Sequence, residues 1–202
     1  EGDDDRAGRW VDAAGDVNSD GYDDILVGAW YHDADDLSRN GAVYLITGPI
    51  DSSVMSLSDD DTYQAKLTGE VSHAGAGAWT TGIEDLTGDG APDLLVGAFR
   101  HSASEAAVPA ADDHDGHYIG ALYLVNGSIT GDFSLSDAAY ATVIGSRRLH
   151  ELAYTGDNAG DLNGDGLSDV IVGTYSSGEA FVLLDVASIE GHDNMITDVA
   201  DA

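Results

Sequence analysis

Short apolar runs, separated by Gly, Asn and Asp, recur along the whole of this 202-residue chain. One set of runs, at 25–27, 94–96 and 170–172, ends each time in Gly. A second set, at 41–46, 120–125 and 178–183, begins with Gly and has an aromatic residue near its middle. Runs of this length between turn residues are typical of β-strands, and no stretch has the period of an amphipathic helix. The pattern therefore predicts an all-β protein.

The runs belong to a repeat of about 70 residues. An oxygen-rich loop precedes each run of the first set, and the three loops begin at Asp16, Asp85 and Asp161, which are 69 and 76 residues apart. The distance from the loop start to the second set varies, because residues are inserted at 31–40 and at 101–118. Strands that keep their sequence while their connection changes length are joined by surface loops.

Each period holds three to four such runs, including two more at 65–69 and 141–145. Repeated sheets of about four antiparallel strands predict the blades of a β-propeller. Three blades are too few to close a propeller ring. We therefore expect residues 1–202 to be a partial propeller that starts and ends in mid-blade, with its repeat loops at 16–24, 85–93 and 161–169. The whole is expected to be larger and seven-bladed.

The three loops have oxygen-bearing side chains at alternate positions, followed by Gly at the sixth position and Asp at the ninth. Calcium requires six to eight oxygen ligands on a tightly curled loop, which this spacing supplies. The candidate side-chain ligands are Asp16, Asn18, Asp20 and Asp24 in loop one, Asp85, Thr87, Asp89 and Asp93 in loop two, and Asp161, Asn163, Asp165 and Asp169 in loop three. We therefore predict about three Ca²⁺ sites, and the second should be the weakest because Thr87 replaces Asn.

Two other interpretations of the loops are an EF-hand and ordinary acidic turns. An EF-hand shares the first six positions but requires Glu at position 12, where this chain has Val27, Val96 and Val172 inside predicted strands. Ordinary Asp/Asn/Gly turns of an acidic protein are the simpler alternative, but three copies in register favour calcium. Several carboxylates in one loop repel each other until a cation neutralises them, so the predicted role of the metal is structural.

These loops, between a Gly-aromatic approach and a Gly-Ala exit, resemble the FG-GAP repeat of integrin α-subunit propellers and their bacterial relatives. The family pattern implies three further ligands, the backbone carbonyls of Tyr22, Ala91 and Leu167. The Phe-Gly element is absent as such, and aromatic residues (Trp30, Phe99 and Tyr175) replace the Pro of Gly-Ala-Pro. These departures point to a divergent, prokaryotic type and weaken the case for integrin-like ligand binding.

Charge narrows the range of partners. The chain has 38 acidic residues and 7 basic ones, a net charge of −31, and Lys66 is its single lysine. Such a surface is expected of a halophilic protein, because salt screens the self-repulsion. It argues against nucleic acid or an anionic membrane as partner, since phosphate contacts need Lys and Arg. No apolar run is long enough to insert into a bilayer.

The histidines and aromatic residues give weaker predictions. His114 and His117 suggest zinc, but no fourth ligand is identifiable, which favours a solvated acidic loop. We expect His32 and His101, which share a repeat position, on a blade rim, and His73, His150 and His192 in solvent. Four recurring aromatic residues are predicted to be core: Trp10, Trp79, Tyr44 and Tyr123. Another four follow strands and are candidate ligand contacts: Trp30, Tyr31, Phe99 and Tyr175.

No catalytic constellation is recognisable. The chain has no Cys and no Gly-x-Ser-x-Gly motif, and abundant carboxylates single out no acid pair. The leading hypothesis is a non-enzymatic, calcium-stabilised, extracellular or cell-surface module that binds a protein or glycan through its blade loops, together with further blades of the same chain. The alternative is a non-catalytic scaffold within a larger secreted enzyme that acts on polysaccharide or lipid.

Overall fold

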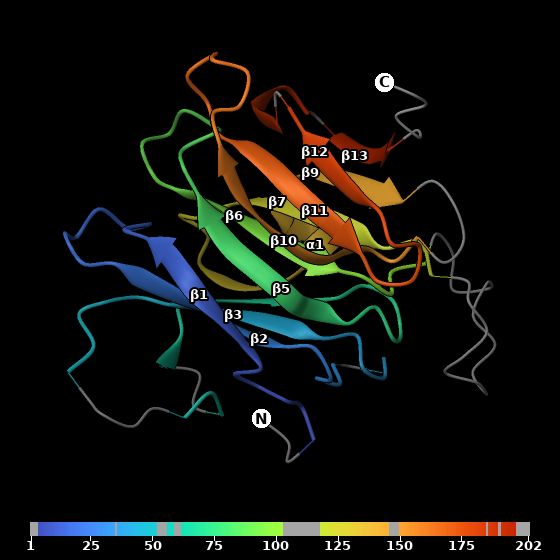
Figure 1. Ribbon diagram of the computed structural model, residues 1–202. Coiled ribbons are helices and arrows are strands. Elements are labelled where there is room, and N and C mark those ends of the chain that lie inside the picture. The colour runs from blue at the N-terminus through green and yellow to red at the C-terminus, as the bar shows by residue number, and fades with distance from the viewer. Residues whose placement is uncertain are drawn as a thin grey trace.

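Strands dominate the computed structural model, which describes residues 4–34, 36–51, 56–58, 62–102, 118–145, 150–184, 186–189 and 191–196 (Figure 1). The strands are β1 (Trp10–Gly15), β2 (Asp24–Ala29), β3 (Ala42–Ile46), β4 (Ala65–Thr68), β5 (Ala76–Ile83), β6 (Asp93–Ala98), β7 (Ala121–Asn126), β8 (Gly131–Ser134), β9 (Ala139–Gly145), β10 (Leu152–Gly160), β11 (Asp169–Thr174), β12 (Ala180–Leu183) and β13 (Gly191–Ile196). The prediction of an all-β protein is confirmed.

The strands form three antiparallel blades. Blade 1 is β1-β2-β3-β4, blade 2 is β5-β6-β7-β9 and blade 3 is β10-β11-β12. The first strands of the blades pack side by side, β1 on β5 and β5 on β10, so the blades fan out from a common edge (Figure 1). Each oxygen-rich loop joins the first two strands of its blade, as the sequence predicts.

Two additional strands, β8 and β13, each pair with the outer strand of the preceding blade and so connect neighbouring blades. After β7 the chain crosses to blade 1, where β8 pairs in parallel with the outer strand β4; after β12 it crosses to blade 2, where β13 pairs in parallel with β9. Outer edges that would otherwise expose unpaired backbone groups are therefore covered. Between β8 and β9 lies the short helix α1 (Leu135–Ala138), capped by the Ser134 side chain, and no described helix is long and apolar enough to cross a membrane.

Neighbouring blades contact each other through their backbones at glycine positions, because glycine has no Cβ. A Cβ at Gly28 would lie 2.1 Å from the carbonyl oxygen of Gly77, and one at Gly97 would lie 2.3 Å from that of Ala153. Gly28 and Gly97 occupy the Gly position of the recurring Gly-Ala dipeptide that ends the second strand of a blade. A side chain has no room there, because the first strand of the next blade lies against this position. The third-copy equivalent, Gly173, is close only to Thr155 of its own blade.

The apolar core follows the same repetition. In blade 1, Leu26 is fully buried against blade 2, and its equivalent in blade 2, Leu95, is fully buried against blade 3. The third equivalent, Ile171, is 38% exposed. Val182 beside it is 45% exposed, whereas its blade 2 equivalent Leu124 is buried. The far face of blade 3 is thus apolar, and no described residue covers it.

Candidate functional site

The three repeat loops are organised in the same way by their first carboxylate. Asp16 accepts hydrogen bonds from the amides of Asp20 and Gly21, at 3.0 and 2.9 Å. Asp85 and Asp161 do the same for the fourth to sixth residues of their loops. The chain therefore curls around this side chain, and the Gly at position six adopts φ values of 91°, 95° and 92° that favour Gly.

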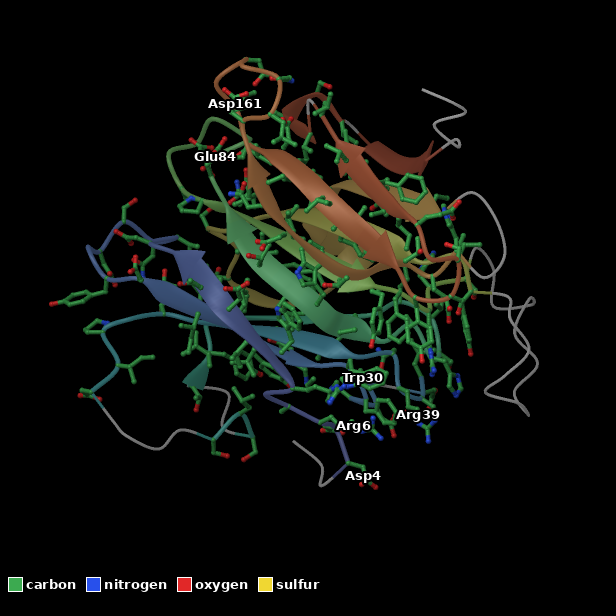
Figure 2. All side chains as sticks on the ribbon, viewed as in Figure 1. Asp4, Arg6, Trp30, Arg39, Glu84 and Asp161 are labelled. Carbon is green, nitrogen blue, oxygen red and sulfur yellow. The ribbon has the colours of Figure 1, made fainter. Side chains whose placement is uncertain are left out.

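The third and fifth side chains tighten the curl. Asn18 and Asn163 each accept a hydrogen bond from the amide of the fifth residue at 2.9 Å. Thr87 instead donates its hydroxyl proton to Asp85 over 3.4 Å, so the second loop differs at this position. The fifth carboxylate accepts the amide of the seventh residue in all three loops. These groups lie on exposed turns at one end of the sheets, where Asp161 is labelled in Figure 2.

The ninth carboxylate is buried in every loop: Asp24 and Asp93 have no exposed surface, and Asp169 is 1% exposed. Asp24 accepts amide protons with both oxygens, from Val17 and Gly48, at 2.8 Å each. Asp93 accepts the amides of residues 86 and 87 with Oδ2, whereas its Oδ1 is buried and has no hydrogen-bond partner among the described residues.

Burial raises the pKa of Asp93 to about 6, although its amide partners act in the opposite direction and the nearby carboxylates of Asp89 and Asp85 add to the increase. Burial also raises the pKa of the Tyr140 hydroxyl, and the negative charges of Asp93 and Asp85 add to this increase. The pKa of the exposed Asp89 is lowered, mainly by its hydrogen bond to Asn126. The second loop therefore holds a buried carboxylate whose charge is poorly compensated.

The donor set suits a hard cation in chemistry, and the unpaired Oδ1 of Asp93 is a group that such a cation would satisfy. Within the described residues, however, no three Asp, Glu or His side chains already converge as a metal-binding cluster. The carboxylates are turned towards the amides of their own loops. An ion would therefore recruit oxygens that now share their lone pairs with backbone N–H groups.

Two side chains outside the repeat motif hydrogen-bond to the loops. The sequence pattern does not single them out. Glu84, which precedes loop two, accepts hydrogen bonds from both the amide and the hydroxyl of Ser168 in loop three. Asn126 at the end of β7 donates to Asp89 over 2.6 Å. A Glu occurs before the loop start in the second copy alone, where the others have Gly, and this difference was the available signal.

Histidine–carboxylate pairs occupy the opposite end of the blades. His32 and His101 are each 9% exposed and His150 is fully buried. The pairs are His32 with Asp5 (3.3 Å), His101 with Glu70 (3.5 Å) and His150 with Glu179 (3.4 Å). The expectations of a surface rim for His32 and His101 and of a solvated His150 were therefore wrong, because each imidazole is buried beside a carboxylate. His114, His117 and the side chain of His192 lie outside the described residues.

The aromatic residues at this end form a connected cluster. Ring centroids are 5.7 Å apart for Trp30 and Phe99, 5.1 Å for Phe99 and Tyr154, and 4.6 Å for Tyr154 and Tyr175. Figure 2 shows Trp30 beside Arg6 and Arg39, at the far end of the sheets from Asp161. The core prediction is confirmed for three aromatic residues, Trp79, Tyr44 and Tyr123. It was wrong for Trp10, which is half-buried and lines a pocket.

Comparisons with known proteins match this architecture. Residues 7–46 match the model of the FG-GAP repeat, over β1, its loop, β2 and β3. The chain belongs to the FG-GAP repeat family. Integrin alpha pat-2 of Caenorhabditis elegans is 42% identical over 47% of this FG-GAP chain, and integrin alpha-4 of Xenopus laevis is 28% identical over 84%. The phosphatidylinositol-glycan-specific phospholipase D of Bos taurus is 30% identical over 82%.

The FG-GAP chain spans only a small part of each of these relatives: 7% of the C. elegans integrin, 14% of the Xenopus integrin and 18% of the bovine phospholipase D. What the three have in common with this chain is therefore a set of FG-GAP repeats, which is a binding or scaffold module.

Proposed function

We propose that this FG-GAP chain is a non-catalytic binding module of an extracellular or cell-surface protein, and that about three Ca²⁺ ions hold its repeat loops in place. The role of the metal is structural. It neutralises three carboxylates per loop and fixes the connection between the first two strands of each blade, so that metal binding and local folding are coupled.

The buried ninth carboxylate is the observation that carries the calcium proposal. Burying a carboxylate at this position in all three loops costs free energy unless its charge is compensated. In loop two the compensation by protein groups is incomplete, since Asp93 Oδ1 has no described partner. A divalent cation bound between this oxygen and the side chains of Asp85 and Asp89 would supply the missing charge.

We also propose that further blades of the same protein pack on the far face of blade 3. The support is the repeat itself: Leu26 and Leu95 are buried by the following blade, whereas Ile171 is exposed at the equivalent position. Gly173 gives the same indication. Its equivalents Gly28 and Gly97 each lie against a backbone carbonyl of the next blade, whereas Gly173 lies against none among the described residues.

Ligand binding is assigned to the end opposite the metal loops, where the aromatic cluster lies and where the described parts of the two insertions (31–34, 36–40, 101–102 and 118) are found. A protein or a glycan is the expected partner. The match to a phospholipase D over 82% of the chain supports a second candidate, in which the repeats are the non-catalytic scaffold of a larger secreted enzyme. A catalytic domain elsewhere in the full-length protein would decide for this second candidate.

Thermal unfolding followed by circular dichroism tests the calcium proposal. Calcium should raise the melting temperature at low salt, EDTA should abolish the increase, and magnesium should substitute poorly because it demands a tighter octahedral shell. Calorimetric titration should find about three sites, with the weakest lost in Asp89→Asn and a stronger one lost in Asp20→Asn or Asp165→Asn. An unchanged melting temperature at low salt would refute the proposal.

A further inference from the structure

One pocket lies in the aromatic end, at the meeting point of the three blades. It has a volume of about 320 Å³, at the lower end of the range of small-molecule sites. Its walls come from three repeat positions, one of which contributes Trp10 and Thr155. Another contributes Arg9, Ala78 and Tyr154, and the third contributes Trp30 and Phe99. Equivalent positions converge here because the first strands of the blades lie side by side.

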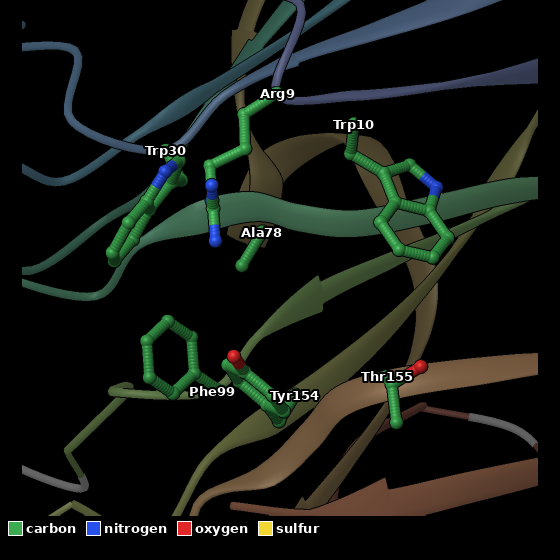
Figure 3. Close-up of a pocket in the computed structure, with 7 residues that line it drawn as sticks. All are labelled: Arg9, Trp10, Trp30, Ala78, Phe99, Tyr154 and Thr155. Atoms are coloured by element: carbon green, nitrogen blue, oxygen red, sulfur yellow. The ribbon is translucent and has the colours of Figure 1, made fainter. Parts of the chain in front are cut away.

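Differences among the three copies give this pocket its shape. The small Ala78 occupies a position where the neighbouring blades have a long Arg9 and a bulky Tyr154, so space is left between them. Figure 3 shows the Arg9 side chain reaching into this space between Trp30 and Trp10, with Phe99 and Tyr154 on the opposite wall. Trp10 is held in place by a 2.8 Å hydrogen bond from its Nε1 to the carbonyl oxygen of Thr80.

The aromatic end of the blades also holds most of the described cations of this acidic protein. Among the five described Lys and Arg residues, only Lys66 lies elsewhere, over Tyr44. Arg6, Arg39 and Arg100 lie over aromatic rings of the cluster, at 3.8 to 5.2 Å from the nearest ring centroids. The Arg9 guanidinium has no ion pair or hydrogen bond with any described residue and is exposed.

Two buried acids at this end of the blades have other partners. Asp5 is paired with His32, and Glu151 accepts a hydrogen bond from Ser176. The pocket therefore combines flat aromatic walls with a guanidinium that has no partner among the described residues. A guanidinium fork matches a carboxylate in two parallel hydrogen bonds.

We propose that this pocket binds a sugar residue that carries a carboxylate, a uronic acid, within the ligand of the binding module. A pyranose ring has C–H bonds on its flat faces, which pack on aromatic rings, and hydroxyls on its rim, which suit the hydroxyls of Tyr154 and Thr155 in the lining. Its carboxylate pairs with Arg9. Because the net charge of −31 repels polyanions at long range, the ligand is a glycan with isolated uronates rather than a continuous acidic polymer.

The inference rests on the proposed role as a binding module and not on calcium, so the test is run on the whole chain with calcium and again in EDTA. Methyl glucuronide is titrated while tryptophan fluorescence is followed, since two of the three Trp residues line the pocket. We expect saturable binding, at least about tenfold tighter than that of neutral methyl glucoside, which is the size of one charge-assisted hydrogen-bond pair.

Variants identify the group responsible. Arg9→Gln should weaken glucuronide binding about tenfold, to the level of the glucoside, and Arg9→Lys should restore part of it. Lys66→Gln is the matched control, because it removes the same charge outside the pocket and should leave binding unchanged. Ala78→Trp should fill the pocket and abolish binding of both sugars. Unchanged melting temperatures of the Arg9 variants would show that folding is intact.

Three results would overturn the inference: no saturation by the glucuronide, equal binding by wild type and Arg9→Gln, or tighter binding of an N-acetylated aspartyl amide, which would make this a site for acidic peptide. Loss of the calcium-dependent melting shift with intact glucuronide binding would refute the calcium proposal alone. An intact melting shift without glucuronide binding would refute the pocket alone.

Discussion

Replacing Asp93 with Asn should stabilise the metal-free chain. Burial raises the pKa of Asp93 from 3.8 to about 6. A carboxyl with a raised pKa in the folded state prefers to be protonated there, so the folded chain loses stability as the pH rises from about 4 to about 6, and the loss is constant above that. Asn has no charge to ionise and therefore does not show this loss.

The magnitude follows from the pKa shift and the hydrogen bonds. At about 1.36 kcal/mol per unit, a shift from 3.8 to about 6 sets a ceiling of about 3 kcal/mol on the loss in free energy of unfolding. Asn keeps an oxygen for the amides of Leu86 and Thr87 but leaves a buried NH₂ group unpaired, which costs about 1 kcal/mol. The net gain is about 2 kcal/mol, or roughly 4–8 °C in Tm for a chain of this size.

Asp24→Asn is the matched control in loop one. Both oxygens of Asp24 accept amide protons, from Val17 and Gly48, so an NH₂ group must face one of these N–H donors. This substitution should destabilise the metal-free chain by about 1–3 kcal/mol. The two variants exchange the same groups at equivalent repeat positions. The opposite signs are expected because Asp93 has an unpaired oxygen and a raised pKa, whereas both oxygens of Asp24 are hydrogen-bonded.

Thermal unfolding in EDTA, followed by circular dichroism at about pH 7.5 and about pH 4.5, measures both effects. The advantage of Asp93→Asn should vanish at the lower pH, where the wild-type carboxyl is already protonated. In saturating calcium the order should reverse, because the wild type has the anionic ligand. A Tm of Asp93→Asn at or below that of the wild type in EDTA at about pH 7.5 would refute this reasoning.

Two further predictions concern contacts between blades. Gly28→Ala should lower the free energy of unfolding by about 3 kcal/mol, measured by urea titration, because its Cβ would meet a carbonyl of blade 2; Gly173→Ala should cost less than about 1 kcal/mol in this chain, and equal losses would contradict the packing. Glu84→Gln and Ser168→Ala should show a coupling of about 1–3 kcal/mol in a double-mutant cycle, whereas additive losses would mean that Glu84 does not join loops two and three.

Local sequence alone specifies the strands, the repeat and the turns of the loops. The hydrogen bonds within each loop join residues at most seven positions apart, so the spacing of Asp, Asn and Gly specifies the turn. Alternation of apolar and turn residues is equally local, which is why the strands and their antiparallel order within each blade were predictable.

The residues that each blade contacts on its neighbours depend instead on the tertiary arrangement. Trp10 and Trp79 occupy the same repeat position, yet one lines a pocket and the other is core, because the residues opposite them differ. His150 is buried through Glu179, and Glu84 reaches Ser168 across 84 positions of sequence. The pocket depends on three copies of one position, Arg9, Ala78 and Tyr154, which approach each other only when the blades are side by side. Such contacts join distant segments, and no local pattern encodes them.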